Sequence, residues 1–458
     1  MNKLFVIGID GAMPEYIFGE WLDKLPTIKK LINQGCYGEL KSTIPPLSAV
    51  AWTAISTGKA PADFGFFEYI YRKNNSYNDL GIISATNIKS KTLWQIASEH
   101  NKKSIICLMP LTWPIKPFNG ICVSGYMTPN TDVEFTYPKE IKNKIETIFN
   151  KQFRIISEFR NKSKEEIIKN VYENTEMHFK LMEYLLKNND YDLFFGVIDE
   201  SDSMNHNFLK YTDKEHSEYD ENFQYKNVLK EYYQYIDKKL GELLNLLDKE
   251  TKIIVLSDHG IIRMHNRVNL SDWLIKEGYL VLKNQITEKI KLKMNLVDWT
   301  ETRAWAIGAF EGQIFVNLKN REPEGIVEEK DYDNLLNEIE EKLKKITGDR
   351  GEKLDTKVFK KKEFFKGEYE HLAPDMIIYF DNLQYGCNTS LIGNELLWSP
   401  QTAIGSDDAG HSQKGIFIMN KCEKTGDIGE VDILDIAPTI LKNIGIESSN
   451  YMKGKVIS

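Results

Sequence analysis

The stretch KIIVLSDHG, residues 252–260, is a continuous apolar run that ends in an aspartate and a histidine. The runs KLFVIGID, residues 3–10, and DLFFGVID, residues 192–199, have the same form. Continuous runs of Ile, Val, Leu and Phe, without alternation of apolar and polar residues, are typical of strands buried on both faces of a parallel sheet. We therefore expect a largely parallel sheet in which several strands end in an acidic residue.

The same apolar pattern recurs further along the chain, in KSIICLM (103–109), DMIIYF (375–380) and GIFIM (415–419). Longer segments with helical periodicity lie between the runs, for example NVLKEYYQYIDKKLGELLNLLDKE (227–250). Strands that alternate with helices predict a layered α/β fold.

Two stretches fit this pattern poorly. Residues 110–165 are rich in Pro, Asn and aromatic residues, and residues 262–400 contain polar, Gly-containing segments. We expect both to be cap insertions over one end of the sheet, within a single catalytic domain that spans residues 1–458.

Composition excludes several classes of protein. The 458 residues are 41% hydrophobic, and the 59 basic and 67 acidic residues are well mixed, so a nucleic-acid polymer is not expected as a partner. The five cysteines are scattered and form no C-x-x-C pair, which favours reduced thiols in the cytoplasm. The apolar part of the N-terminus is too short for a signal peptide, and no run approaches the roughly 18 apolar residues of a membrane helix.

Acidic residues gather where the predicted strands end. Asp10 and Asp258 lie at the ends of their runs, Asp199 closes the run at 192–199, and Asp202 follows it. Ligands of open α/β sheets bind beyond the carboxyl ends of the strands. A single aspartate at such a place also fits a helix cap. Three acidic strand ends, two of them close to a histidine, favour a ligand site instead.

Three of the eight histidines accompany these acids or a strand. His206 lies four residues after Asp202, His259 directly follows Asp258, and His411 comes just before an apolar run. Carboxylate oxygen and imidazole nitrogen suit Zn²⁺ and similar divalent ions. Five or six such ligands exceed one tetrahedral site, which indicates two ions. Two ions about 4 Å apart can clamp the attacking and the leaving oxygen of an in-line phosphoryl displacement.

A nucleophile for that reaction is present in STIPPLSAVAWTAISTGKAP, residues 42–61. Ser48 follows a Pro-Pro-Leu turn and precedes an apolar run with helical spacing. It is therefore expected at a helix N-terminus, where backbone N–H groups and the helix dipole favour an anion. Ser48 fits a nucleophile at this place, and it fits a simple helix N-cap equally well.

Taken together, these motifs resemble the type I phosphodiesterase/nucleotide pyrophosphatase branch of the alkaline phosphatase superfamily. The resemblance rests on GIDGA, STIPPLSAVAWTAISTGKAPADFGFFEY, D-x-x-x-H, SDHG and GHSQKGIFI in this order, and it spans residue 3 to about residue 445. It implies a three-layer α/β/α sandwich with a mainly parallel central sheet and cap insertions. It also implies a metal-dependent phosphoester hydrolase that forms a covalent phospho-serine on a phosphodiester or pyrophosphate substrate.

The resemblance assigns a role to each of seven residues. One ion would be bound by Asp10, Asp258 and His259 with the oxygen of the nucleophile Ser48, and the other by Asp202, His206 and His411. A serine hydroxyl is a weak nucleophile until a metal or a base activates it, and a bound divalent cation does so at neutral pH. Two divalent ions are therefore expected; three imidazoles favour Zn²⁺, and Mn²⁺ would also fit.

One departure from the family concerns the residues after Ser48. Family members often have an Asn shortly after the nucleophile that hydrogen-bonds a phosphate oxygen, but here the next four residues are Ala-Val-Ala-Trp. The substrate is therefore expected to be a small phosphorylated molecule, while nucleotide specificity and the substrate-binding residues stay open. Trp52 and the aromatic residues downstream fit either a leaving-group pocket or core packing.

Several rival functions share this fold. A sulfatase would need a Cys or Ser followed by x-Pro-x-Arg, and Ser48 is followed by Ala-Val. A phosphomonoesterase, a phosphomutase or a phosphonate hydrolase would use the same metal ligands, so these remain alternatives. A non-enzymatic binding protein would be expected to lack some ligands, and all of the ligand positions are filled here.

Overall fold

The computed structural model describes residues 3–157, 159–216, 218–284, 286, 290–308, 310–391, 409–447 and 452–458. The chain forms two compact units. The first consists of Met1–Phe64, Ser84–Ile261 and His411–Ser458, and the second consists of Gly65–Ile83 and Ile262–Gly410.

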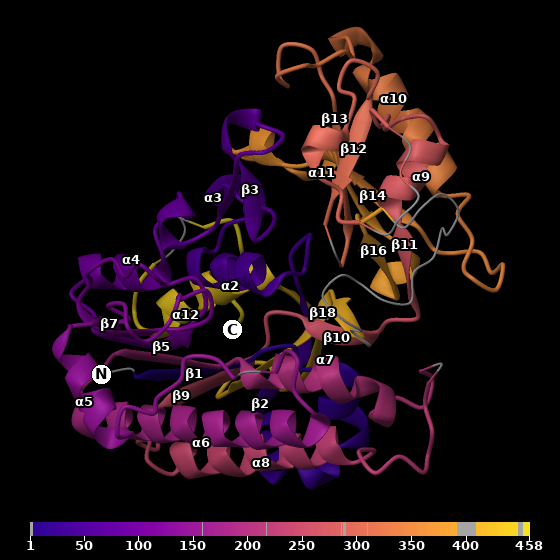
Figure 1. Cartoon of the computed structure of the whole chain (residues 1–458). Helices are drawn as coiled ribbons and strands as arrows, with labels where there is room; N and C mark the ends of the chain where they lie inside the picture. Colours follow the sequence, from indigo (N-terminus) through magenta and orange to yellow (C-terminus); the bar gives the residue numbers. More distant parts are fainter. Residues whose placement is uncertain are drawn as a thin grey trace. The chain divides into compact units, whose positions relative to one another are not determined.

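A nine-stranded sheet forms the centre of the first unit (Figure 1). Its strands, in spatial order, are β19 (Gly426–Asp432), β2 (Gly35–Lys41), β18 (Lys414–Asn420), β9 (Lys252–Leu256), β1 (Leu4–Ile9), β8 (Leu193–Ile198), β5 (Ser104–Met109), β6 (Gly120–Ser124) and β7 (Thr136–Tyr137). The pairs β1–β8, β1–β9, β5–β8, β5–β6 and β2–β19 are parallel. Strand β18 is antiparallel to β2 and β9, and β7 is antiparallel to β6, so the sheet is mainly parallel.

Burial explains why the inner strands are apolar throughout. Every residue of β1, β5 and β8 is buried, because both faces of these strands are covered. The edge strand β19 instead alternates between exposed and half-buried residues over most of its length. This contrast is typical of a sheet with helices on both faces.

Helices form the two outer layers of the first unit (Figure 1). The layer on one face contains α6 (Lys164–Asn188) and α8 (Val228–Leu244), and the other contains α2 (Ser48–Thr57), α4 (Leu93–Glu99) and α12 (Ile436–Asn443). The first unit also contains the α-helices α1 (Pro26–Asn33), α3 (Pro61–Phe64), α5 (Glu140–Ile148) and α7 (Glu200–Thr212). The predicted three-layer α/β fold with a mainly parallel sheet is confirmed.

One buried carboxylate links helix α8 to helix α1 by hydrogen bonds. Asp237 on α8 accepts hydrogen bonds from the backbone N–H groups of Thr27, at 3.0 Å, and Ile28, at 2.8 Å. Both N–H groups belong to the first turn of α1, where they lack a partner within the helix. The Asp237 side chain therefore caps α1 and has both of its oxygens satisfied.

The second unit contains a separate, antiparallel sheet. Its strands, in spatial order, are β12 (Ala304–Ile307), β13 (Gly312–Val316), β15 (Met376–Tyr379) and β14 (Lys357–Lys360). The hairpin of β3 (Ile70–Arg72) and β4 (Leu80–Ile82), the parallel pair of β11 (Asn266–Asn269) and β16 (Tyr385–Asn388), and helices α9 (Leu270–Lys276), α10 (Glu329–Leu343) and α11 (Lys361–Phe364) complete it.

The structure corrects one strand prediction. The run at 375–380 was expected in the central parallel sheet, but β15 lies in the antiparallel sheet of the second unit, between β13 and β14. All four residues of β15 are buried, so the run looks like that of a parallel strand. Burial on both faces, and not strand direction, produces a continuous apolar run, which is why the pattern misled here.

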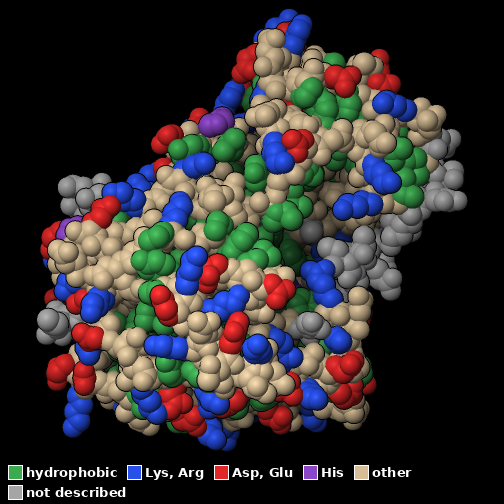
Figure 2. Space-filling view, turned by 60° about the vertical axis from the view of Figure 1, so that its left-hand side comes forward, with side chains coloured by type: hydrophobic (Ala, Val, Ile, Leu, Met, Phe, Trp, Pro, Cys, Tyr) green, Lys and Arg blue, Asp and Glu red, His purple; other side chains and the backbone are tan. Residues whose placement is uncertain are grey.

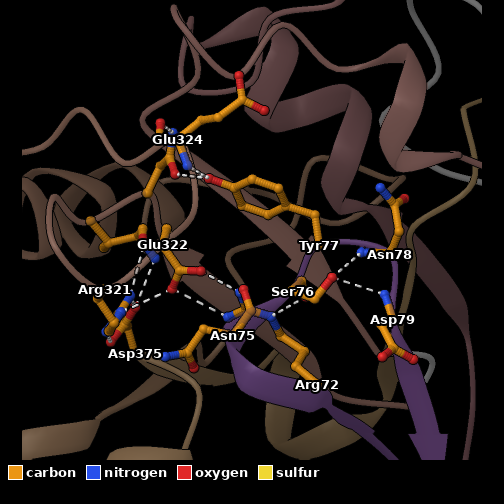
Figure 3. A network of polar contacts seen from close by, with 12 residues as sticks. Arg72, Asn75, Ser76, Tyr77, Asn78, Asp79, Arg321, Glu322, Glu324 and Asp375 are labelled. Atoms are coloured by element: carbon orange, nitrogen blue, oxygen red, sulfur yellow. Dashed lines mark hydrogen bonds and ion pairs between the residues drawn. The ribbon is translucent and has the colours of Figure 1, made fainter.

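Buried ion pairs hold the hairpin of the second unit to the rest of that unit (Figure 3). Arg72 on β3 bonds Glu322, whose side chain has no exposed surface. Arg321 next to it forms two hydrogen bonds to Asp375, at 2.7 and 2.6 Å, and the Lys361 ammonium lies 2.6 Å from the same carboxylate. A segment from early in the chain is thereby attached to residues about 250 positions later.

The surface in Figure 2 carries intermingled basic and acidic side chains, with no continuous basic stripe on the face in view. Among the described residues, no helix combines the length and the apolar character needed to cross a bilayer.

Residues 110–165, expected as an insertion, contribute β6, β7 and α5 to the first unit, and residues 262–400 belong to the second unit. Their role as caps stays a prediction.

Candidate active site

Turns at one edge of the central sheet carry most of the predicted ligands. Asp10 follows β1 directly, and Asp258 and His259 follow β9, each at the carboxyl end of its strand. The neighbouring strand β8 leads into α7, on which Asp202 and His206 lie one turn apart and point to the same side. Because β1, β8 and β9 are parallel, their carboxyl ends meet at the same edge of the sheet.

His411 and Ser48 reach the same edge from other elements. His411 precedes β18, which runs antiparallel to β9, so the start of β18 lies beside the end of β9. Ser48 is the first residue of α2 and is 5% exposed. The His411 Nδ1–H donates to the carbonyl oxygen of Pro46 at 2.8 Å, which ties this histidine to the turn before α2.

Four of the predicted residues form a first group around the His259 ring. The Nε2 atom of His259 lies 3.1 Å from Ser48 Oγ, 3.2 Å from Asp258 Oδ2 and 3.5 Å from Asp10 Oδ1. The side chains of His259, Asp258 and Asp10 have no exposed surface. Asp10, Asp258 and His259 each offer a ligand atom within 4.8 Å of the others, so these three could hold one metal ion.

The other three predicted residues adjoin this group. The Oδ1 atom of Asp202 lies 3.4 Å from His206 Nε2 and 3.8 Å from His411 Nε2, and the two Nε2 atoms are 3.1 Å apart. The rings of His411 and His259 stack with centroids 3.8 Å apart. Asp202, His411 and His259 also offer three ligand atoms within 4.8 Å of one another. The structure therefore brings all seven predicted side chains together.

Hydrogen bonds fix the tautomer of the His259 and His411 rings. Nδ1 of His259 donates to the Gly260 carbonyl at 2.9 Å, as Nδ1 of His411 does to Pro46. Each Nε2 therefore presents a lone pair to the cluster, the arrangement in which imidazole binds a metal ion.

Two buried carboxylate oxygens accept no hydrogen bond within the described part of the chain: Asp10 Oδ1 and Asp258 Oδ2. Both face the lone pair of His259 Nε2, at 3.5 and 3.2 Å. Buried anionic oxygens are stable only with a hydrogen-bond donor or a cation beside them. Their position fits the predicted role of ligands to a cation.

The electrostatics of the cluster point the same way. Burial, and next the charge of Asp258, raise the pKa of Asp10 well above its usual range. Burial also raises the pKa of Asp258 to about 8, with the charge of Asp202 as the next cause. For His259, burial lowers the pKa to about 3. The buried cluster therefore disfavours ionised carboxylates that lack a partner, and it keeps the His259 imidazole neutral. A bound divalent cation would offset the repulsion between the acids.

The chemistry of the donors fits the expected group. Oxygen and neutral nitrogen ligands without a thiolate suit Zn²⁺ or Mn²⁺. Most of the cluster is buried, and it contains three carboxyl groups and a serine hydroxyl close to His259 Nε2. Such an arrangement can hold cations next to a nucleophile. The role of each residue as ligand or nucleophile stays a prediction.

Sequence reasoning missed the groups that orient this cluster. Trp52, predicted to line a pocket or pack in the core, donates its indole N–H to Asp10 Oδ2 at 2.8 Å. The hydroxyl of Ser42 donates to the Asp258 carbonyl at 2.7 Å, and that of Ser201 donates to the Asp10 carbonyl at 2.7 Å. Only the spacing of Trp52, four residues after Ser48, could have suggested a common helix face.

Glu200, two residues before Asp202, bonds to residues of another helix. Its carboxylate lies 3.1 Å from Nδ1 of His178 and accepts a hydrogen bond from Asn174 at 2.6 Å. Both partners are on α6, so Glu200 links α6 to the start of α7.

Comparison with known proteins agrees with this picture. The sequence profile of the type I phosphodiesterase/nucleotide pyrophosphatase family matches residues 4–390. The match includes six of the seven predicted site residues and ends before His411. A search of curated protein sequences gave no significant match.

Solved structures with the same fold cover nearly the whole chain. Phosphonoacetate hydrolase from Sinorhizobium meliloti 1021, in complex with phosphonoacetate, has a TM-score of 0.65 at 15% identity, with 97% of this chain and 96% of that chain covered. Murine ectonucleotide pyrophosphatase/phosphodiesterase 5, an inactive variant in complex with AMP, has a TM-score of 0.57 at 12% identity, with the same coverage. The human form of the latter has a TM-score of 0.55 at 14% identity, covering 99% and 97%.

The profile match over most of the chain, and the alkaline phosphatase-like fold shared with these structures, confirm the resemblance seen in the motifs. The chain belongs to the type I phosphodiesterase/nucleotide pyrophosphatase family, and it is a phosphoric ester hydrolase.

Proposed function

We propose that this protein hydrolyses a phosphodiester or pyrophosphate bond of a small substrate, with Ser48 as the nucleophile. The observation that supports the proposal most directly is the position of Ser48 Oγ, 3.1 Å from His259 Nε2 and beside two buried carboxylates. A hydroxyl that only capped a helix would accept a bond from a backbone N–H of its first turn. For α2 the N-cap is Leu47, and no side chain caps the helix.

The reaction proceeds in two displacements. The hydroxyl of Ser48 loses its proton and its oxygen forms a bond to phosphorus, while the bond from phosphorus to the leaving oxygen breaks and that oxygen takes up a proton. Water then attacks the phospho-serine, which releases the phosphorylated product and restores the hydroxyl. At the start of α2 the first N–H groups bonded to a carbonyl are those of Val50 and Ala51, both to Leu47. We assign the earlier N–H groups of this helix to a phosphoryl oxygen of the substrate.

Two cations complete the proposal. Asp10, Asp258 and His259 would hold one ion together with the oxygen of Ser48; the other would be held by Asp202, His206 and His411. Such ions supply the positive charge that lowers the pKa of a hydroxyl and offsets charge on the phosphoryl group. Three imidazoles favour Zn²⁺ over Mn²⁺. Around them, the hydrogen bonds of the two Nδ1 atoms keep the rings oriented.

The class of substrate separates this proposal from its rivals. Neighbours of the same fold include one protein solved with AMP and one solved with phosphonoacetate. The Asn that often follows the nucleophile in this family is missing, so phosphonate hydrolysis is the second candidate. The cytoplasmic location remains a prediction that rests on the scattered cysteines.

One paired assay tests the proposal. Metal-loaded wild type is expected to hydrolyse bis-p-nitrophenyl phosphate faster than p-nitrophenyl phosphate, and Ser48→Ala is expected to abolish both activities. Ser56→Ala is the matched control, because the Ser56 hydroxyl lies on the same helix and bonds the Thr53 carbonyl at 3.1 Å. A preference for phosphonoacetate or for the monoester would move the assignment to a rival, and turnover retained by Ser48→Ala would exclude the covalent step.

A further inference from the structure

Trp52 joins the nucleophile helix to a strand end of the predicted metal cluster. It lies on α2, and its side chain is 1% exposed. The indole Nε1–H donates to Asp10 Oδ2 at 2.8 Å, while Oδ1 of the same carboxylate points to His259 Nε2 at 3.5 Å. One oxygen of Asp10 is thus held by the indole and the other is presented to the cluster.

The sequence of β1 provides the space for this ring. A Cβ atom on Gly8 would lie 2.2 Å from Cη2 of Trp52, so no other residue leaves room for the indole at its present place. Phe195 on the adjacent strand β8 contacts the ring edge to face, with centroids 6.2 Å apart. Gly8, near the end of β1, therefore leaves space for the Trp52 ring, and Asp10, just after β1, accepts its N–H.

The position of Trp52 on α2 links this contact to Ser48. Residues four apart on a helix project from the same side, so the Trp52 side chain follows that of Ser48 by one turn. A hydrogen bond from the indole to Asp10 then limits the rotation of the carboxylate. It also limits displacement of the first turn of α2 along the sheet. Both the ligand oxygen and the nucleophile depend on this contact.

We propose that Trp52 is a positioning residue, whose indole N–H holds the Asp10 carboxylate in the orientation that binds a divalent cation beside Ser48. This inference rests on the proposed function. Groups that hydrogen-bond a metal ligand typically change metal affinity by about 10- to 100-fold when they are removed. The effect is expected at one ion only, because Trp52 bonds Asp10, a predicted ligand of that ion, whereas the other ion is assigned to Asp202, His206 and His411.

The test measures binding of Zn²⁺ alone to the chelator-treated full chain by titration calorimetry. Wild type is expected to bind two ions. Trp52→Phe is expected to lose roughly 10-fold or more in affinity for one of them and to leave the other unchanged. Trp94→Phe, which truncates another buried tryptophan of the first unit, is the control and should bind like wild type. Two sites of wild-type affinity in Trp52→Phe would overturn the inference while leaving the proposed function intact.

Two further measurements separate the hydrogen bond from packing. Replacement of Trp52 by 3-benzothienylalanine keeps the ring shape and removes the N–H, so it should reproduce the loss of affinity even if Trp52→Phe fails to fold; wild-type affinity would overturn the inference. In the Asp10→Ala variant, adding the benzothienyl residue should cause no further loss of Zn²⁺ affinity. An equal loss of affinity in the wild-type and Asp10→Ala backgrounds would refute the inference. If wild type binds no Zn²⁺ at all, the proposed function itself fails.

Discussion

Replacing Asp258 with asparagine should change stability in opposite directions with and without metal. The ligand oxygens of Asp10 and Asp258 lie within 4.8 Å of each other and are buried. At that separation two negative charges repel by about 3 kcal/mol at an effective dielectric constant of about 20. Burial raises the pKa of Asp258 to about 8, so the metal-free wild type must either keep this repulsion or protonate the carboxyl group. Asparagine avoids both costs, keeps the oxygen that accepts the Gly11 N–H at 3.4 Å, and offers its NH₂ group to the acids. In chelator, Asp258→Asn should therefore melt roughly 3–6 °C above wild type.

With metal bound, the order should reverse. A ligand present at about 1,000 times its dissociation constant adds about 4 kcal/mol to the stability of the folded state. Wild type gains this stabilisation, whereas Asp258→Asn has lost an anionic ligand and gains much less. The assay is a pair of thermal melts of each protein, one in chelator and one in saturating Zn²⁺. The diagnostic result is that Asp258→Asn melts above wild type in chelator and below wild type in Zn²⁺.

Asp237→Asn is the matched control, because Asp237 is equally buried but is satisfied by two backbone N–H groups. An amide NH₂ at this position would face one of these donors, which should cost about 1–3 kcal/mol with or without metal. If Asp258→Asn behaves like this control, melting below wild type by the same amount in both conditions, then Asp258 is an ordinary satisfied core residue and the reasoning about the cluster is wrong.

In the second unit, Asp375→Asn should lower the free energy of unfolding by about 3–5 kcal/mol, because it leaves the buried part of the Arg321 guanidinium without its anion (Figure 3). Urea unfolding followed by tryptophan fluorescence measures this, and an unchanged midpoint would contradict it. Burial raises the pKa of Glu68 to about 8, with repulsion from Glu311 as the next cause, and burial raises that of Glu311 to about 7. The folded state therefore binds more protons than the unfolded state between about pH 4.5 and 8, so the stability contributed by this pair is present below pH 4.5 and lost as the pH rises to 8. Glu311→Gln should make the decline shallower in melts across this range, and parallel curves for both proteins would refute the prediction.

The sequence predicted the parts of the fold that depend on local pattern. Five of the six apolar runs lie in the central sheet, because a strand covered on both faces must be apolar along its whole length. The convergence of Asp10, Asp202 and Asp258 followed from topology alone, since carboxyl ends of parallel strands share an edge. The sixth run, at 375–380, was placed in the wrong sheet, because burial carries no information on the direction of neighbouring strands.

The sequence pattern could not predict contacts between segments that are far apart in the chain. The indole of Trp52 and the carboxylate of Asp10 are 42 residues apart, and nothing in either motif shows that one donates to the other. The same holds for Arg72 and Glu322, which are separated by 250 residues. Spacing rules describe neighbours on one helix or one strand, whereas these pairs are set by how a helix packs on a sheet or a hairpin on its unit.

The arrangement of the cluster predicts that the first unit can fold without metal. Asp10 and Asp258 follow strands whose inner residues are wholly buried, so the positions of these carboxylates are set by the apolar sheet and not by a cation. Their repulsion, about 3 kcal/mol, is small beside the burial of even a few of the large apolar side chains in β1 and β8, at roughly 1.5–3 kcal/mol each. The sheet can therefore hold the acids together in the absence of metal, and cations would bind to a site that is already formed.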